Sequence, residues 1–206
     1  MAASLPSPSP APLVVGIGGT PKPGSSTEQA LTLALASAAR DGAETLMFGG
    51  AYLASLPLYL TPDSEAAGGE MIDAVRRADG ILLASPGYHG VMSGMVKNAI
   101  DYLEATSRDP RAYLDGLPVG LIVTAAGWQA TGSTLAALRA TVHALRGWPT
   151  PMGAAINTGD GVLSGGVCRD AGVAAQIDLV GRQVALFARL KLADSASLKG
   201  DPAAGD

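Results

Sequence analysis

The sequence is poor in cysteine and histidine. Its 206 residues include one cysteine, Cys168, and two histidines. A single cysteine cannot form a disulfide within the chain, and no Cys-x-x-Cys or His/Cys grouping offers the spacing of a metal site. We therefore expect no bound metal. The low cysteine content fits a reducing compartment, so we expect a cytoplasmic location.

Charged residues and long apolar runs are also scarce. Only 16 % of the chain is charged, and 14 Lys and Arg against 18 Asp and Glu give a formal net charge of −4. Because no basic cluster is present, we expect neither nucleic acid nor an anionic membrane as a partner. The longest apolar runs, such as 119–123, are strand-sized, whereas a membrane span needs about 20 residues. The first twelve residues also lack the pattern of a secretory signal.

Hydrophobic residues make up 48 % of the chain, which is enough for a well-filled core. We expect one domain at 13–195 between a flexible Ser/Pro-rich tail at 1–12 and a second flexible tail at 196–206. Apolar runs predict strands at 13–17, 45–48, 81–84, 118–124 and 153–156. Helical periodicity predicts helices at 26–40, 69–78, 93–105, 133–146 and 171–192.

The ends and faces of two helices can be predicted in more detail. In the first helix, Ser26 and Gln29 have the spacing of a capping box, and Asp41-Gly42 forms the stop. In the last helix, the apolar stripe expected to be buried consists of Ile177, Val180, Val184, Phe187 and Leu190.

Fully apolar strands that alternate with amphipathic helices predict an α/β fold. The expected architecture is a doubly wound parallel sheet of five strands with helices on both faces. Ligands of such sheets bind beyond the carboxyl ends of the strands, at the topological switch point. Function should therefore be sought in the loops that follow the strands.

The loop after the first strand, residues 16–27, allows three kinds of phosphate site. A dinucleotide fingerprint is denied by Pro21 and by the lack of an acid after Phe48. A triphosphate P-loop is denied by Ser25, which stands in the place of the required lysine. Hydroxyls, backbone N–H groups and Lys22 at a helix N-terminus instead suit a phosphate monoester. The alternative is that this loop is merely a tight turn with a helix cap.

Three segments carry a resemblance to a known family. They are GGTPKPGSST at 18–27, SPGYHGVMSGMVKNAIDYL at 85–103 and TAAGWQATG at 124–132. In these segments, and in the order of its elements over 13–192, the chain resembles the NADPH-dependent FMN reductase family. The resemblance implies a flavodoxin-like fold with strand order 2-1-3-4-5 and FMN at the carboxyl edge of the sheet.

The resemblance also implies site residues. The FMN phosphate would be held by Thr20, Lys22, Ser25, Ser26 and Thr27. The isoalloxazine ring would run along Pro86, Gly87, Tyr88 and His89, and Thr124, Ala125, Ala126 and Gly127 would flank its other side. Many relatives carry Glu where this chain has Gly87. Because backbone groups do most of the binding there, we expect the glycine to be tolerated.

Several conspicuous residues have a structural alternative. Tyr88 could stack near the flavin or pack at a dimer surface, and His89 could donate a proton to an acceptor or be a polar loop residue. Lys97 and Asp101, four residues apart on a helix, are expected to pair structurally. His143 is expected to be solvated, and Cys168 to be a packing residue.

The polar segment 106–115, with Arg108 and Arg111 exposed, lies in a region that the resemblance places near a subunit interface. The resemblance implies that the protein forms a homodimer, or a tetramer.

The activity implied is that of a flavin reductase, in which NADPH or NADH passes a hydride to flavin N5. Such chemistry needs orientation and a dry site rather than a dedicated acid or base. The electrons would go to a small-molecule acceptor, such as free FMN, a quinone or an azo compound, or to a partner monooxygenase. Three alternatives stay open: a flavodoxin-type electron carrier, a flavin-dependent tailoring oxidoreductase of secondary metabolism, and a phosphate-binding scaffold without activity.

Overall fold

Five parallel strands form the central sheet of the structure, a computed structural model that describes residues 10–159 and 161–200, with side chains up to 195. Their order is β2-β1-β3-β5-β6, which confirms the expected 2-1-3-4-5 topology. The strands are β1 (Leu13–Gly18), β2 (Glu44–Phe48), β3 (Gly80–Tyr88), β5 (Pro118–Ala125) and β6 (Trp148–Asn157). The order changes direction at β1 and β3, so the carboxyl ends of these strands form the switch point.

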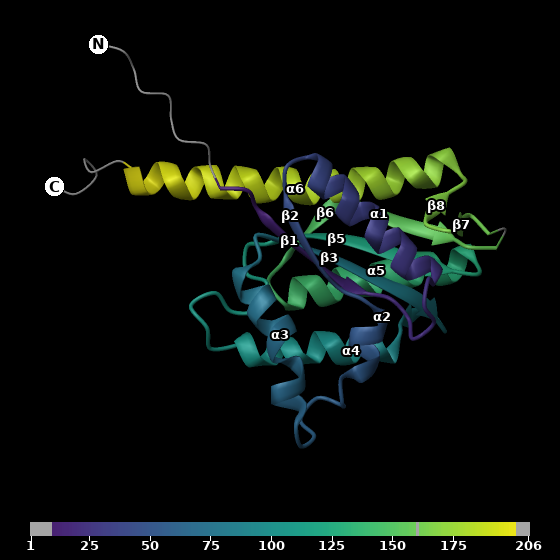
Figure 1. The fold of residues 1–206 in the computed structure, drawn as a ribbon, viewed down its shortest axis with the longest axis horizontal. Coiled ribbons are helices and arrows are strands. Elements are labelled where there is room, and N and C mark those ends of the chain that lie inside the picture. Colours follow the sequence, from purple (N-terminus) through teal and green to yellow (C-terminus); the bar gives the residue numbers. More distant parts are fainter. Residues whose placement is uncertain (1–9, 160, 201–206) are drawn as a thin grey trace, which may run out of the picture.

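Helices cover both faces of the sheet (Figure 1). On one face, α1 (Ser26–Arg40) and α6 (Ala171–Gly200) form one core with side chains such as Val14 and Leu82. On the other face, a second core includes Val15 and Ile81 and side chains of α3 (Ser64–Arg77), α4 (Gly94–Asp101) and α5 (Trp128–Ala144). Because alternate strand residues enter different cores, the strands are apolar throughout.

Short elements escaped prediction. They are α2 (Gly50–Ser55), β4 (Val91–Met92), β7 (Leu163–Ser164) and β8 (Val167–Cys168). The helix predicted at 93–105 consists of α4 and of the 3₁₀ helix η1 (Tyr102–Thr106). Several predicted elements are longer than expected: α3 and α5 each begin five residues earlier, β6 begins at Trp148 rather than at 153, and β3 continues to Tyr88 rather than to 84. Strand β6 tolerates Pro149 and Pro151 because it lies at the edge of the sheet, where the N–H groups on its outer side have no neighbouring strand to bond.

The start of α1 differs from the predicted capping box. The N-cap is Ser25, whose Oγ accepts a hydrogen bond from the Glu28 amide at 3.3 Å. The Glu28 carboxylate in turn accepts from the Gly24 amide at 3.0 Å. The assignment of Ser26 and Gln29 was therefore one residue too late, and the side chain of Gln29 is available for other contacts. The stop at Asp41 is confirmed.

Helix α6 buries less of its apolar stripe than expected. Ile177, Val180 and Val184 are buried, but Phe187 and Leu190 are 40 % and 56 % exposed. The prediction was wrong for these two because the buried face of α6 continues through Ala185 and Ala188, both fully buried, and leaves Phe187 and Leu190 beside it. The helix then extends past the sheet, as Figure 1 shows. The helix continues to Gly200, beyond the expected end of the domain at 195. Residues 1–9 and 201–206 of the expected tails lie outside the described residues.

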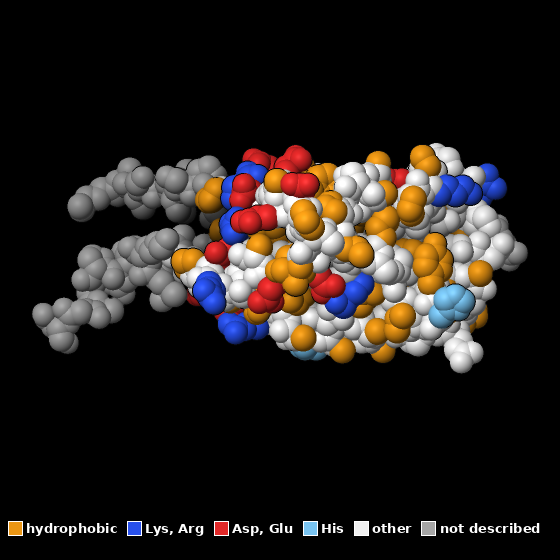
Figure 2. Space-filling model, turned by 90° about the horizontal axis from the view of Figure 1, so that it is seen from below, with side chains coloured by type: hydrophobic (Ala, Val, Ile, Leu, Met, Phe, Trp, Pro, Cys, Tyr) orange, Lys and Arg blue, Asp and Glu red, His pale blue; other side chains and the backbone are white. Residues whose placement is uncertain are grey.

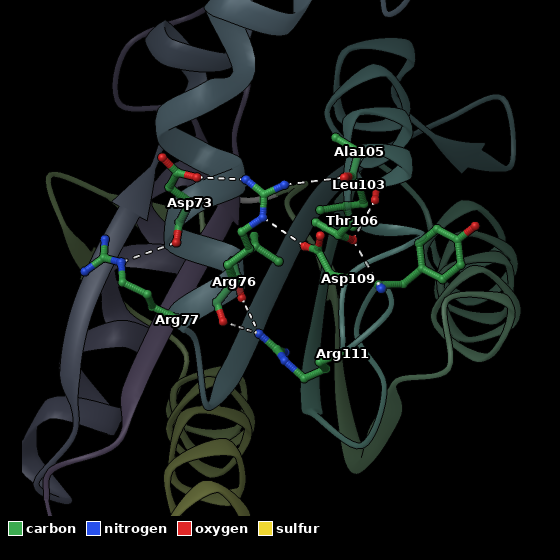
Figure 3. Close-up of polar contacts among 10 residues, drawn as sticks. Asp73, Arg76, Arg77, Leu103, Ala105, Thr106, Asp109 and Arg111 are labelled. Atoms are coloured by element: carbon green, nitrogen blue, oxygen red, sulfur yellow. Dashed lines mark hydrogen bonds and ion pairs between the residues drawn. The ribbon is translucent and has the colours of Figure 1, made fainter.

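The amino ends of the strands lie near a network of arginines and carbonyl groups (Figure 3). Arg76 forms ion pairs with Asp73 and Asp109, both at 2.9 Å. Nη2 of Arg111 donates to the carbonyl oxygens of Val75 and Arg76, at 2.6 and 2.8 Å, at the end of α3. Arg111 is thus half-buried rather than exposed, because it caps a helix from a neighbouring loop, and burial lowers the pKa of its guanidinium.

Within the described part of the chain, no helix has the length and apolar character needed to cross a membrane.

Candidate functional site

A cavity of about 650 Å³ opens at the carboxyl ends of β1, β3 and β5. It contains all the predicted site residues except His89 and Gly127. The predicted residues that line it are Thr20, Lys22, Ser25, Ser26, Thr27, Pro86, Gly87, Tyr88, Thr124, Ala125 and Ala126. Gly24, Gln29, Thr158, Leu163, Ser164 and Gly165 also line it and were not predicted.

The first wall of the cavity is the loop between β1 and α1. It can begin only with glycines, since Gly18 and Gly19 have φ values of 153° and 132°. A Cβ at Gly18 would also lie 2.1 Å from the carbonyl oxygen of Ala84 on β3. This close approach packs the end of β1, where the loop begins, against β3, the strand that forms the second wall.

Several donors of this loop are available to a ligand. The amides of Ser26 and Thr27 open α1 and donate to no group among the described residues, whereas the Lys22 amide donates to Thr20 Oγ1 at 3.2 Å. The Lys22 side chain is exposed and forms no ion pair within residues 10–159 and 161–195. Free amides at a helix N-terminus beside a cation suit an anion of monoester size.

Two buried hydroxyls join the first wall to the third. Thr27 Oγ1 on α1 lies 2.6 Å from Thr124 Oγ1 at the end of β5. One hydroxyl donates to the other, which leaves a single hydroxyl hydrogen for another acceptor. These two threonines therefore fix the spacing of the walls and can still offer one donor to a ligand.

The second wall is the end of β3, which continues into a hairpin with β4. Tyr88 pairs with Val91, and the two-residue turn between them consists of His89 and Gly90 with φ values of 52° and 91°. Two positive φ angles are typical of a type I′ turn. This turn places the exposed His89 outside the residues that line the cavity, while Tyr88 lines it and is 54 % exposed.

Ser85, the residue before this wall, holds the hairpin in place. Its buried hydroxyl donates to the carbonyl oxygen of Pro86 at 2.9 Å and accepts from the amide of Ser93 at 3.0 Å. The Ser93 side chain in turn caps α4. The serine of the Ser85-Pro86 pair in the second motif segment therefore has a structural role.

Gly87 is surrounded more tightly than the sequence indicates. A Cβ there would lie 2.8 Å from Thr134 Oγ1 and 3.1 Å from the carbonyl oxygen of Ala130, both on α5. Thr134 is fully buried, and its hydroxyl has no hydrogen-bond partner among the described residues. Helix α5 therefore occupies the space that a side chain at position 87 would need.

The third wall is the end of β5 with residues 124–126. Gly127 follows as the N-cap of α5, in extended conformation and outside the lining of the cavity. Trp128, the first residue of α5, is 67 % exposed. Sequence reasoning gave this tryptophan no role, and it is not among the residues that line the cavity.

Thr158 and the β7–β8 hairpin supply a fourth wall that sequence reasoning missed. Two glycines, Gly165 and Gly166, form the turn of the hairpin with φ values of 61° and 79°. A Gly-Gly pair between short apolar segments is a hairpin signal that was available in the sequence.

Other residues of the motifs hold the structure together. Lys97 and Asp101 form an exposed ion pair on α4, as predicted. Asn98 accepts from the Tyr59 amide and donates to the carbonyl oxygen of Pro57, both at 2.9 Å. His143 is exposed, as expected, and Cys168 is half-buried in β8, where its thiol donates to the carbonyl oxygen of Asp170.

The donor set of the cavity fits FMN. It offers an anion site of free amides with a cation at one end, and strand ends whose backbone and small side chains can lie against a planar ring.

The family model that describes NADPH-dependent FMN reductases matches residues 12–160. An NAD(P)H-dependent FMN reductase of Pseudomonas aeruginosa is 31 % identical over 134 residues, which cover 63 % of this chain and 68 % of that protein. An NADPH azoreductase of a Bacillus species is 32 % identical over 90 residues, or 42 % of this chain. The chain spans about half of that azoreductase, since the match covers 47 % of its length.

Among solved structures, the flavoenzyme NAD(P)H:(acceptor) oxidoreductase FerB of Paracoccus denitrificans superimposes with a TM-score of 0.69 at 21 % identity. The superposition covers 87 % of this chain and 98 % of FerB. At this identity, the likeness supports the fold.

Proposed function

Because the chain belongs to the NADPH-dependent FMN reductase family, we propose that it binds FMN and transfers electrons from NADPH or NADH through this cofactor to an acceptor. The observation that carries the proposal is the cavity at the switch point. There, one opening contains free helix amides, an exposed lysine and the ends of three parallel strands.

In this proposal, the loop between β1 and α1 binds the phosphate. The amides of Ser26 and Thr27 donate to phosphate oxygens, and the Ser26 hydroxyl and Lys22 add a donor and a positive charge. Thr20 and Ser25 shape the loop, because their hydroxyls accept from the amides of Lys22 and Glu28. A lysine neutralises the anion as a point charge, without the two-pronged geometry of an arginine.

The strand ends orient the ring. The backbone of Pro86, Gly87 and Tyr88 lies along one side of the cavity, and Thr124, Ala125 and Ala126 lie along the other. Bound FMN supplies the hydride-accepting chemistry, so the protein needs no acid or base of its own. The roles of these residues are orientation and the exclusion of water. His89, on the exposed turn, and Gly127, at the N-cap of α5, can contribute only from the rim.

The acceptor in this proposal is a small molecule or a partner monooxygenase, and the protein acts in the cytoplasm as a homodimer or a tetramer. The exposed side chains of Tyr88, Val91 and Trp128 support an apolar contact on this side of the molecule. Sedimentation at several protein concentrations tests the oligomer.

The activity is tested by reconstituting the protein with FMN under anaerobic conditions and recording its visible spectrum before and after a small excess of NADPH. We expect rapid bleaching of the bound flavin. A protein that binds FMN and stays yellow with both NADPH and NADH would contradict the reductase and favour an electron carrier. A protein that binds no FMN would contradict the cofactor assignment itself.

A further inference from the structure

The β7–β8 hairpin lies outside the part of the chain that the family model matches, residues 12–160, and nevertheless lines the flavin cavity. Leu163, Ser164 and Gly165 stand on one side of this cavity, and the phosphate-binding loop stands on another. In Figure 1 the hairpin lies beside α1 and the start of α6. A wall that the matched part of the family does not provide can give this chain a property of its own.

One side chain connects this hairpin to the phosphate-binding loop. Oε1 of Gln29 accepts a hydrogen bond from the Gly166 amide at 2.8 Å, and Nε2 of the same side chain donates to the carbonyl oxygen of Gly24 at 2.7 Å. The two ends of one amide therefore bind one wall each. Gln29 lies on the first turns of α1, a rigid element, so it can hold both walls at a set distance.

The hairpin is attached firmly at its base and weakly at its turn. Leu163 is buried in the core between α1 and α6, whereas residues 164–167 are exposed. A hollow of about 530 Å³ lies behind the hairpin, lined by Gly166, Val167 and Cys168 and by side chains of α1 and α6. In the described part of the chain, the bond to Gln29 is the hydrogen bond that joins the turn to α1.

We infer that Gln29 is a positioning residue that holds the β7–β8 hairpin against bound FMN and slows the release of the cofactor. The inference rests on the proposed function and deepens it, because it makes FMN a retained prosthetic group rather than a substrate that leaves after each turnover. With the hairpin bound to Gln29, Leu163, Ser164 and Gly165 wall one side of the cavity. Without this bond, the turn can move into the hollow behind the hairpin.

The test is the rate of FMN release from Gln29→Ala, followed by the recovery of flavin fluorescence after dilution of the reconstituted protein. We expect release about tenfold faster than from the unchanged protein, because two side-chain hydrogen bonds are lost. The association rate should change little. The matched control is Gln183→Ala, which removes a similar bond, from the Met152 amide to Gln183 Oε1 at 2.9 Å, away from the cavity. Release from this control should be unchanged.

A second variant tests whether Gln29 acts through the hairpin. Leu163→Ala loosens the base of the hairpin, so it should also speed release, and the double variant should release FMN no faster than the faster single variant. Unchanged release from Gln29→Ala, or effects that multiply in the double variant, would overturn the inference.

Hydrogen exchange of the Gly166 amide in the flavin-free protein provides a readout that does not depend on FMN. We expect faster exchange in Gln29→Ala than in the unchanged protein, and equal exchange would contradict the bond to the hairpin. If the unchanged protein failed to bind FMN, the proposed function would fall, whereas this exchange measurement would still decide whether Gln29 holds the hairpin.

Discussion

The two edges of the sheet use their polar groups in opposite ways. Near the amino ends of the strands, Arg76 is paired with two carboxylates, and Nη2 of Arg111 donates to two carbonyl oxygens of α3, although the buried Nη1 of Arg111 has no partner among the described residues. At the carboxyl ends, the amides of Ser26 and Thr27 and the charge of Lys22 have no partner among the described residues. Figure 2 shows where charged side chains lie on one face: acidic and basic side chains mix on the half nearer the grey atoms, and few acidic ones lie on the other half.

This difference separates stability from binding. Polar groups that are satisfied within the chain fasten helices and loops to each other, and a ligand would have to break their bonds. Groups that are left free at a helix N-terminus cost little in water and become available to an anion. Substitution of a paired group at the amino edge should therefore lower stability, and substitution of a free donor at the carboxyl edge should lower the affinity for FMN. Three variants test this division, in order of decreasing effect.

Lys22→Glu should have the largest effect. It places a carboxylate beside the phosphate, and we expect the affinity for FMN to fall about 100-fold, or about 2.7 kcal/mol. The exposed side chain makes no described contact that folding needs, so the midpoint of urea unfolding of the flavin-free protein should stay the same. Titration of FMN fluorescence measures the affinity.

The control for this variant is Lys97→Glu, which reverses the charge of an exposed lysine that does not line the cavity. It should leave the affinity for FMN unchanged. Equal affinities of the two variants would remove Lys22 from the phosphate site.

Arg111→Ala should show the opposite signature at the other edge. It removes two charged hydrogen bonds from the end of α3, so we expect the free energy of unfolding to fall by about 2 kcal/mol. The affinity of the folded protein for FMN should not change. Urea unfolding measures the first quantity, and Arg111→Lys, which keeps the charge and part of the bonding, should recover some of the loss. A loss of FMN affinity without a loss of stability would contradict the division between the edges.

Gly87→Ala should have the smallest effect and is an exception to this division, because Gly87 lines the cavity but packs against α5, so its substitution should lower stability. The added methyl group meets Thr134 Oγ1 at 2.8 Å, and overpacking of this kind costs about 1–2 kcal/mol of stability. Thr134→Ala removes both that contact and an unpaired buried hydroxyl, so the double variant should regain most of the loss. Thermal unfolding of the single and double variants forms the test. If Thr134→Ala failed to rescue the glycine variant, another neighbour would have to explain the glycine.

The parts of the structure that sequence predicted best depend on local patterns. The five strands and the main helices follow from apolar runs and helical periodicity. The strand order, which the structure confirms, was implied by the family resemblance. The first and last residues of the elements were predicted less accurately than their order and type. The start of α5 at Trp128 and the prolines of β6 follow from packing in the folded sheet, which a single window of sequence does not contain.

The candidate site was predicted in part for the same reason. Thr20, in the loop after β1, and Pro86, near the end of β3, were predicted because ligands of parallel sheets bind at the carboxyl edge. Thr158 was missed although it directly follows β6, whereas Gln29 and Leu163 were missed because they line the cavity only through the packing of α1 and the β7–β8 hairpin. His89 was predicted in the site with its neighbours, but it lies in the exposed turn of the β3–β4 hairpin and is not among the residues that line the cavity.

The sequence by itself determined the fold class, the family resemblance and the presence of a loop suited to a phosphate, because each depends on residues that are close in the chain. Only the tertiary structure decided which donors of that loop stay free, why α5 leaves room for nothing larger than glycine at position 87, and that Gln29 joins the loop to a distant hairpin. Those facts are distances between segments far apart in sequence, and they arise from how helices pack on the sheet.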